Sequence, residues 1–300
     1  MLNQQKLDLF FYYLREREQV RIKKESGQPW PFTQDDILKY NKFTNVLRKN
    51  DRATRWFIKY WATPNLDKPL EVQLYNCGLF RYFGTIDFAS TVGYRTAGHN
   101  PGHLISTANK MLSDGLKVFT GAYVITNGGI KAPKEEIVAN IYLEGLWKKA
   151  PELVKIARET KRWELVAKEL MRLNGWGGTG FMTKECLSDA MFTAVLNDCI
   201  DRNEWSPCGP GARRGLNWLH DRREDFNQRE DLFLNEMKEL FEIAPTRPEW
   251  DSTMPKVGEE FDLHGIQFAL CEIYKYQKVK NGLGRPRSGY GPDRVNRKEV

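Results

Sequence analysis

Three kinds of sequence pattern are missing from this 300-residue chain, and each absence excludes a class of protein. There is no run of about 18 apolar residues, and no apolar leader follows Met1, so we expect neither a membrane span nor a signal peptide. The five cysteines include no C-x-x-C pair, so we expect reduced thiols and neither a metal nor a cofactor. The sequence has no Gly-Lys-Ser/Thr P-loop, which excludes the usual cradle for ATP phosphates. Together these absences predict a cytoplasmic protein.

What the chain does have is a basic beginning and a basic end. The formal charge at pH 7 is +7; residues 11–61 carry 12 Lys/Arg against 6 Asp/Glu, and residues 273–300 carry 8 against 2. Aromatic residues are interleaved with these charges, namely Trp30, Phe32, Trp56, Trp61, Tyr274, Tyr276 and Tyr290. Such segments suit contact with DNA phosphates and stacking on unpaired bases. A solvated basic face has the same composition, so composition alone leaves both interpretations open.

Hydrophobic spacing predicts a mainly α-helical fold. With 41% hydrophobic and 12% aromatic residues, the chain is large enough for a sizeable core. Helical periodicity and helix-start residues indicate helices over 7–24, near 35, near 54, after 133, over 151–172, over 229–243 and over 262–279. One β-rich run, 117–126, indicates a short strand or hairpin. We expect a single domain over 1–300, with 1–132 and 133–300 as possible sub-lobes.

A glycine-rich turn separates two helical stretches. The sequence Leu173-Asn-Gly-Trp-Gly-Gly-Thr-Gly-Phe-Met-Thr-Lys-Glu185 has the form of a helix–hairpin–helix motif. Its glycines would let backbone amides approach a DNA phosphate, and the helix that follows adds a positive N-terminus. The residues expected at the phosphate are Gly175, Gly177, Gly178 and Gly180. The alternative is a glycine-rich connection that only packs tightly.

A second motif places two arginines at a helix start. A stiff Gly-Pro-Gly corner precedes Arg213 and Arg214. Guanidinium forks bind phosphate or pyrophosphate oxygens in pairs, and the helix dipole adds to the attraction. This is the best anion-site candidate, with incidental surface arginines as the alternative.

A third basic motif begins on the last helix and ends in an arm. Glu272, Lys275 and Lys278 are spaced to share one helix face. Lys275 is a candidate general base or phosphate ligand, and an exposed salt-bridge face is the alternative. The arm contributes Arg285 and Arg287 as expected phosphate contacts.

Taken in order, these and other motifs resemble a known family. They are Arg15-Glu-Arg17 to Lys24, Gly27-Gln-Pro-Trp-Pro-Phe-Thr33 to Leu38, Lys42-Phe-Thr-Asn-Val46, Arg48-Lys-Asn-Asp51 to Trp56, Val118-Phe-Thr-Gly-Ala-Tyr123, Phe181-Met182 with Asp189, Gly209-Pro-Gly-Ala-Arg-Arg-Gly-Leu216 and Cys271-Glu272 to Arg287. The pattern resembles the α-glutamyl/putrescinyl-thymine pyrophosphorylase family and the helical domain of 5-hydroxymethyluracil DNA kinases. It covers nearly the whole chain. The resemblance implies a DNA-glycosylase-like helical fold used in thymine hypermodification, typically of bacteriophage DNA.

The resemblance also implies a reaction. In that pathway the hydroxymethyl oxygen of a 5-hydroxymethyluracil base in DNA is phosphorylated or pyrophosphorylated, and an amine or amino acid then displaces the phosphate group. Because the chain lacks the P-loop of the kinase step, we expect a transferase for the displacement step. Its partners would be DNA containing modified thymine, a small amine or amino acid and a P-loop DNA kinase of the same pathway, with no membrane. A phage-encoded chain would act in the host cytoplasm.

Two other functions stay open. The chain could be a non-catalytic DNA-binding subunit of a 5-hydroxymethyluracil DNA kinase, or a monofunctional DNA glycosylase. Schiff-base glycosylases of the helix–hairpin–helix type carry a lysine at the end of the glycine turn, where this chain has Thr179 and Gly180. Base excision through a lysine is therefore disfavoured.

The expected chemistry assigns roles to particular residues. Arg213, Arg214 and Arg55 would neutralise the leaving pyrophosphate. Asp189 or Asp36 would accept the proton of the amine or anchor its ammonium form, with helix capping or a core hydrogen bond as the alternative for each. Because the methylene is hidden in a duplex, the base is expected to be extruded and stacked. The remaining candidates for DNA or base contact are Trp30, Phe32, Asn45, Arg48 and Arg52.

Overall fold

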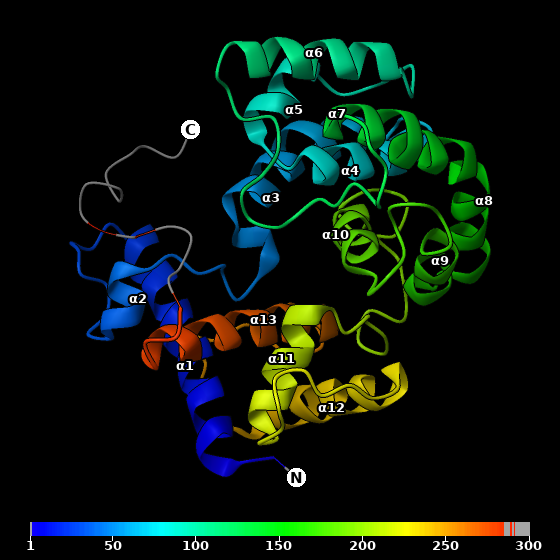
Figure 1. Cartoon of the computed structure of the whole chain (residues 1–300). Helices are drawn as coiled ribbons and strands as arrows, with labels where there is room; N and C mark the ends of the chain where they lie inside the picture. The colour runs from blue at the N-terminus through cyan, green and yellow to red at the C-terminus, as the bar shows by residue number, and fades with distance from the viewer. Residues whose placement is uncertain (1, 285–288, 290, 292–300) are drawn as a thin grey trace. The chain divides into compact units, whose positions relative to one another are not determined.

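The computed structural model describes residues 2–284, 289 and 291, and within these residues it is mainly helical (Figure 1). This confirms the predicted mainly α-helical class. The described residues form no β-sheet; isolated bridges join Asn41 to Gly289 and Val257 to Phe261. The helix–hairpin–helix motif and the glycosylase-like fold stay predictions. None of the described helices has the length and apolar character needed to cross a membrane.

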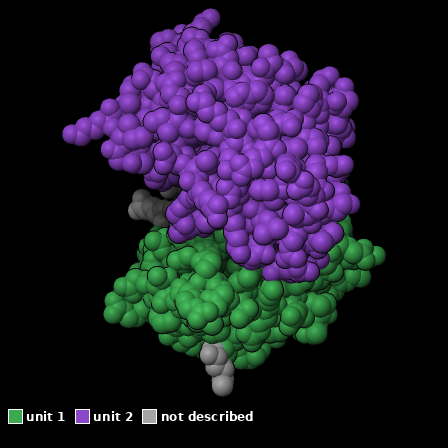
Figure 2. Space-filling model, turned by 90° about the vertical axis from the view of Figure 1, so that its right-hand side faces the viewer, with its two compact units in different colours: residues 1–52, 206–300 green, residues 53–205 purple. Residues whose placement is uncertain are grey.

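The contacts within the chain define two compact units (Figure 2). Unit 1 comprises Met1–Arg52 and Ser206–Val300, and unit 2 comprises Ala53–Trp205. These bounds differ from the sub-lobes 1–132 and 133–300, and the single-domain prediction stays a prediction.

Unit 1 is built from the two ends of the chain. Its helices are α1 (Gln4–Glu25), α2 (Asp36–Tyr40), α11 (Pro210–Leu219), α12 (Glu230–Ile243) and α13 (Leu263–Lys280), with short 3-10 turns at Arg48–Asn50 and Ala244–Thr246. The core includes Phe10, Phe11, Leu216, Phe233 and Leu270. Helices α11 and α13 meet at backbone distance, because a Cβ on Gly215 would lie 2.3 Å from the Leu270 carbonyl oxygen. Glycine is therefore required at this crossing.

In unit 2, the other elements pack around the buried helix α4. Its elements are α3 (Arg52–Phe57, whose first residue is assigned to unit 1), a π-helical turn at Ile58–Ala62, a 3-10 turn at Thr63–Asn65, α4 (Leu70–Phe83), α5 (Ile86–Val92), α6 (Pro101–Ser113), α7 (Lys134–Ile137), a π-helical turn at Val138–Leu143, α8 (Glu144–Thr160), α9 (Trp163–Leu170) and α10 (Phe181–Ala190). Every residue of α4 from Val72 to Phe83 is buried. A helix that is apolar nearly all round belongs in the centre of its unit.

The helix expected over 151–172 is in fact two helices. Helix α8 ends at Thr160, where Lys161 adopts a left-handed conformation with φ of 53°. Helix α9 then starts from a carboxylate far along the chain, because Asp201 accepts hydrogen bonds from the backbone N–H groups of Trp163 and Glu164 at 2.7 and 2.9 Å. A cap supplied by a residue 38 positions away leaves no local signal in the sequence.

The hairpin expected over 117–126 is wrong. The segment is an extended loop without a strand, and its β-branched residues Val118 and Ile125 fill the core of unit 2. Its backbone pairs with the end of α4, where Thr120 N donates to Phe83 O at 2.8 Å. The Tyr123 hydroxyl donates to the Arg81 carbonyl oxygen at 2.5 Å. The apolar character of this run thus reflects packing against a helix rather than a sheet.

Candidate functional site

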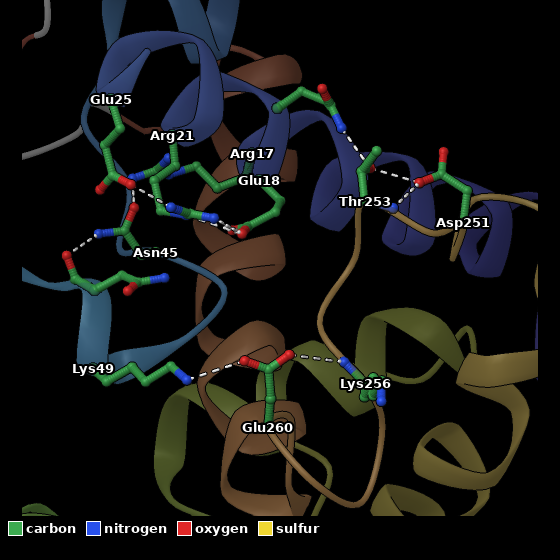
Figure 3. A network of polar contacts seen from close by, with 12 residues as sticks. Arg17, Glu18, Arg21, Glu25, Asn45, Lys49, Asp251, Thr253, Lys256 and Glu260 are labelled. Atoms are coloured by element: carbon green, nitrogen blue, oxygen red, sulfur yellow. Dashed lines mark hydrogen bonds and ion pairs between the residues drawn. The ribbon is translucent and has the colours of Figure 1, made fainter.

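In unit 1, an arginine of α1 holds the loop between α2 and α3 by hydrogen bonds. Arg17 donates to Phe43 O at 3.2 Å and to Asn45 Oδ1 at 2.6 Å (Figure 3). The Asn45 backbone N–H and side-chain Nδ2 both donate to Asp51 Oδ1, at 2.9 and 3.1 Å. Desolvation by burial raises the pKa of Asp51, against the opposing hydrogen bond from Asn45. The side chain of Asn45, a predicted DNA contact, thus forms hydrogen bonds that order this loop.

The same loop is anchored on the other side by lysine and carboxylate residues. Lys49 pairs with Glu260 at 3.1 Å, and Glu260 also accepts from the backbone N–H of Lys256 (Figure 3). From α13, Glu272 accepts a hydrogen bond from Thr44 N at 3.2 Å. The loop 41–51 is therefore rigidly placed within unit 1.

Glu272 also forms an ion pair with a predicted functional residue. Lys275 Nζ lies 2.5 Å from Glu272 Oε1. The Glu272 side chain is only 8% exposed, while that of Lys275 is 58% exposed. The pair thus joins a carboxylate held inside unit 1 to an ammonium group at its surface, which is suitable for proton transfer and for phosphate contact.

A small cavity lies beside this carboxylate. It is lined by Tyr13, Leu14, Arg17, Thr44, Asn45, Val46, Ala269 and Glu272, and its volume of about 10 Å³ is close to the smallest that holds one water molecule. The Tyr13 hydroxyl is buried and hydrogen-bonds to no described residue. Burial, and then the charge of Glu272, raise the pKa of Tyr13. We call Tyr13, Arg17, Asn45, Glu272 and Lys275 the α13 cluster.

The two arginines at the start of α11 point to different partners. Arg213 donates to Cys208 O at 2.8 Å and to Asn227 Oδ1 at 3.0 Å, and it forms an ion pair with Glu230. It therefore braces the helix start. Adjacent residues on a helix project about 100° apart, so Arg213 and Arg214 contact different partners, and a joint anion site stays a prediction.

Arg214 remains half-exposed in a surface hollow of about 400 Å³. Its guanidinium lies 3.3 Å from Glu224, and in the same hollow Arg223 pairs with Asp225 at 2.9 Å. Two carboxylates thus balance two guanidiniums. The hollow offers an anion less net attraction than a pair of unopposed arginines would, and the phosphate-binding role of both arginines stays a prediction.

In unit 2, the glycine-rich turn connects α9 to α10. Gly175 and Gly178 have φ of 86° and 67°. A Cβ on Gly175 would lie 2.3 Å from the Tyr142 ring, and one on Gly177 would lie 2.6 Å from the Met171 carbonyl oxygen. Tight packing thus gives a reason for glycine at these two positions. A Cβ on Gly178 would meet nothing within 4 Å. Phosphate contact stays a prediction for all four glycines of the turn.

Asp189 lies in the core of unit 2. Its oxygens accept from Arg81 Nε and Nη2 at 2.5 and 2.6 Å, and Arg81 also donates to Thr54 at 2.9 Å. Asp189 is 0% exposed. Burial would lower the pKa of Arg81, but the charge and hydrogen bonding of Asp189, together with the charge of Glu185, outweigh it and raise that pKa. This carboxylate is placed to hold α10 against α4, and no substrate reaches it in this conformation.

The other predicted carboxylate, Asp36, is exposed in the first turn of α2. Its neighbour Asp35 caps that helix, accepting from the N–H groups of Ile37 and Leu38 at 2.9 and 3.0 Å. Asp35 also accepts from the Tyr276 hydroxyl at 2.5 Å. The capping interpretation thus applies to Asp35, and a role for Asp36 as base stays a prediction.

The remaining predicted contacts are dispersed. Phe32 is 3% exposed and packed in the interior, so it offers no face to an extruded base in this conformation. Trp30 is partly buried, and the Arg48 guanidinium lies 4.9 Å from the Phe268 ring centroid. Arg52 and Arg55 are exposed on α3. Arg285 and Arg287 lie outside the described residues.

Sequence reasoning missed Tyr13 and Arg17. Tyr13 is hidden within the apolar stripe of α1, and Arg17 stands in a run of alternating charges that is typical of a solvated face. The buried depth of Glu272 was also missed, although Leu270 and Ile273 on either side belong to the core. A carboxylate within such an apolar stripe is the signal that could have found it.

Comparison with known proteins agrees with the resemblance noted in the sequence. A profile of the family described as "5-hmdU DNA kinase, helical domain" matches residues 4–283. The 5-hmdU DNA kinase of Bacillus phage SP10 is 22% identical over 288 residues, which cover 90% of this chain and 44% of that protein. The chain thus spans less than half the length of this relative. No solved structure matches the chain. The chain belongs to the family of the helical domain of 5-hmdU DNA kinase.

Proposed function

We propose that this chain binds DNA containing modified thymine and acts in the hypermodification of 5-hydroxymethyluracil. The observation that carries the proposal is the family match over residues 4–283, which covers both compact units. The relative is named for a kinase that acts on 5-hmdU DNA. The basic segments 11–61 and 273–280 are suited to the phosphate contacts that such a substrate requires.

We further propose that the reaction is the displacement of (pyro)phosphate by an amine or amino acid. The amine nitrogen attacks the methylene carbon on C5 of the base, the carbon–oxygen bond breaks, and the (pyro)phosphate leaves with the electron pair. The nitrogen loses one proton to a carboxylate. Support for this step comes from the α13 cluster, where Glu272 is the candidate proton acceptor and Lys275 the candidate cation for the leaving oxygen.

A direct test uses duplex DNA whose 5-hydroxymethyluracil has been pyrophosphorylated. The full chain is incubated with this DNA and a panel of amines and amino acids, and the nucleosides are analysed by mass spectrometry. We expect a new nucleoside with one amine and release of pyrophosphate. The Glu272→Gln variant should lose the product, whereas Glu159→Gln, an exposed carboxylate of α8, should keep it. Unchanged DNA with every amine would contradict the transferase proposal.

A second candidate function is a non-catalytic DNA-binding subunit that presents 5-hydroxymethyluracil to a separate kinase. The observation that favours it is that the chain aligns with 44% of a kinase and matches a family described as the helical domain of such kinases. The test is copurification with a P-loop protein and stimulation of its kinase activity on 5-hydroxymethyluracil DNA. Stimulation without any new nucleoside in the previous experiment would select this function.

A further inference from the structure

Two surface clusters, one in each unit, have the same composition. Each contains a lysine, the tyrosine that follows it and a tryptophan. We call them the Lys-Tyr-Trp triads: the first is Lys39, Tyr40 and Trp30 in unit 1, and the second is Lys59, Tyr60 and Trp56 in unit 2. The α13 cluster includes neither triad.

The first triad presents an aromatic face beside a positive charge. Lys39 Nζ lies 5.1 Å from the Tyr40 ring centroid and 5.4 Å from that of Trp30. The two ring centroids are 5.9 Å apart. Tyr40 is 49% exposed, so a large part of its ring is available to a ligand.

The second triad repeats this arrangement on a different element. Lys59 Nζ lies 4.9 Å from the Tyr60 ring centroid, and Tyr60 lies 5.4 Å from Trp56. Trp56 is stacked on the buried Phe80, with centroids 5.8 Å apart and an interplanar angle of 9°. Tyr60 is 45% exposed. Trp56 therefore fixes the second triad to the core of unit 2, while the Tyr60 ring is exposed to solvent.

Single exposed aromatics and lysine–aromatic contacts are ordinary features of protein surfaces. Tyr12, Tyr40 and Tyr60 are the exposed tyrosines among the described residues, and two of them, Tyr40 and Tyr60, lie beside both a lysine and a tryptophan. An exposed ring offers a stacking face to any base, and the adjacent ammonium offers a contact to the phosphate of the same nucleotide. Bases in a duplex are already stacked on both sides, so this combination suits an unpaired base.

We propose that each Lys-Tyr-Trp triad binds one unpaired nucleotide of DNA, with the base stacked on the tyrosine and the phosphate beside the lysine. The proposal rests on the proposed function only in naming DNA as the ligand. It assigns the chain a capacity to hold single-stranded or locally opened DNA, which binding to a closed duplex would not require.

The experiment measures the affinity of the full chain for a fluorescently labelled oligothymidylate of about 15 nucleotides, a length within the range of single-strand sites. The variants are Tyr40→Ala, Tyr60→Ala and the double variant. The control is Tyr12→Ala, an equally exposed tyrosine whose hydroxyl donates to Asp35. Because each base–aromatic stack contributes to affinity separately, each single variant should bind about 5- to 150-fold more weakly. The double variant should lose about the product of both factors, and Tyr12→Ala should bind like the unmodified chain.

Conservative variants separate stacking from folding. Tyr40→Phe and Tyr60→Phe should retain single-strand affinity, because the ring face remains. Lys39→Gln and Lys59→Gln should each reduce the slope of log affinity against log salt by about 0.7. Thermal unfolding should match the unmodified chain for all these surface variants. Single-strand binding that is unchanged in the double alanine variant would overturn the proposal.

Binding measurements on duplex DNA distinguish failure of this proposal from failure of the proposed function. Preference for duplex DNA with 5-hydroxymethyluracil over the same duplex with thymine tests the proposed function alone. Such a preference together with no affinity for single strands would overturn the triad proposal and leave the proposed function standing. Tight binding of oligothymidylate without any preference for 5-hydroxymethyluracil would support the triads and count against the proposed function.

Discussion

Each unit contains an ion pair with a buried carboxylate, and the two pairs differ in how much of the basic partner is exposed to solvent. In unit 2, Arg81 and Asp189 are joined by two hydrogen bonds, and their side chains are 8% and 0% exposed. In unit 1, Glu272 is similarly buried, but its partner Lys275 is 58% exposed, and close by is the Tyr13 hydroxyl, which has no hydrogen-bond partner among the described residues. A fully buried bidentate pair stabilises a particular packing, whereas a half-exposed pair keeps one charge available to a substrate.

This difference in exposure determines which of the residues proposed from the sequence are available to a substrate. Asp189 has both oxygens occupied by a guanidinium in the core. Glu272 and Lys275 keep the properties that a proton acceptor and a phosphate contact need. The following variants test whether the two pairs behave as differently as their surroundings indicate.

The largest effect is expected for Asp189→Ala. The substitution leaves the Arg81 guanidinium buried without its carboxylate, so the free energy of unfolding should fall by about 3–5 kcal/mol. The measurement is urea unfolding followed by circular dichroism. Glu159→Ala, which breaks the exposed pair with Lys155, is the control and should change stability by less than about 0.5 kcal/mol. Equal stability of the two variants would show that the buried pair is no stronger than a surface pair.

Lys275→Met tests the exposed pair. In contrast to Asp189→Ala, it should change the stability little and the rate of amine transfer strongly. Because Lys275 is more than half in solvent, the free energy of unfolding should fall by less than about 1 kcal/mol. Loss of the cation should reduce the rate of amine transfer by about 10²–10³-fold, as for removal of one charge-stabilising donor. Rates are measured by release of pyrophosphate in single-turnover assays. The control is Lys155→Met, which changes an exposed lysine of α8 and should retain the full rate. If Lys275→Met instead loses much stability without a change in rate, the Glu272–Lys275 pair has a structural role and no role in catalysis.

The glycine turn offers a smaller comparison within unit 2. Gly175→Ala and Gly178→Ala both place a side chain at positive φ, which costs about 1–2 kcal/mol. Only the first also drives a Cβ into the Tyr142 ring, and crowding of this kind adds about 1–3 kcal/mol. Thermal or urea unfolding should show that difference. If the turn also holds a phosphate, Gly178→Ala should weaken duplex binding despite its milder effect on stability; unaltered binding would leave tight packing as the role of the turn.

The smallest expected effect is the pH dependence of stability at Asp51. Desolvation raises its folded pKa above the unfolded value, so the folded state binds the proton more tightly. The contribution of this group to stability is present below the unfolded pKa and is lost as pH rises through the folded pKa. Asp51→Asn should therefore gain stability relative to the unmodified chain at pH 7 and lose that advantage near pH 3.

Asp221→Asn provides a control of opposite sign in the same unit. Hydrogen bonds from Lys6 and then Asn3 lower the pKa of Asp221, so its contribution is present above the unfolded pKa and lost as pH falls. This variant should be less stable than the unmodified chain at pH 7, and the difference should shrink toward pH 3. Parallel pH profiles for the two variants would contradict both pKa directions.

Parts of the fold and of the site were accessible from local pattern. The last helix is predicted to begin at residue 262, and Asp262 caps it, because its side chain accepts from Gly265 N at 3.0 Å. The start of α2 and the spacing of Glu272 and Lys275 on one helix face were also correct. Each of these depends on residues three or four positions apart, which a sequence displays directly.

By itself, the sequence determined the helical class, several helix starts, the charged segments and the resemblance to the family. Only the tertiary structure decided that Asp189 is held by Arg81, 108 positions away, that Arg213 contacts Cys208, Asn227 and Glu230 at the start of its own helix, and that Glu272 lies inside unit 1. The physical reason is that the availability of a charged side chain depends on its burial and on its partners. Both are set by chain segments that are distant in sequence, and no local pattern records them.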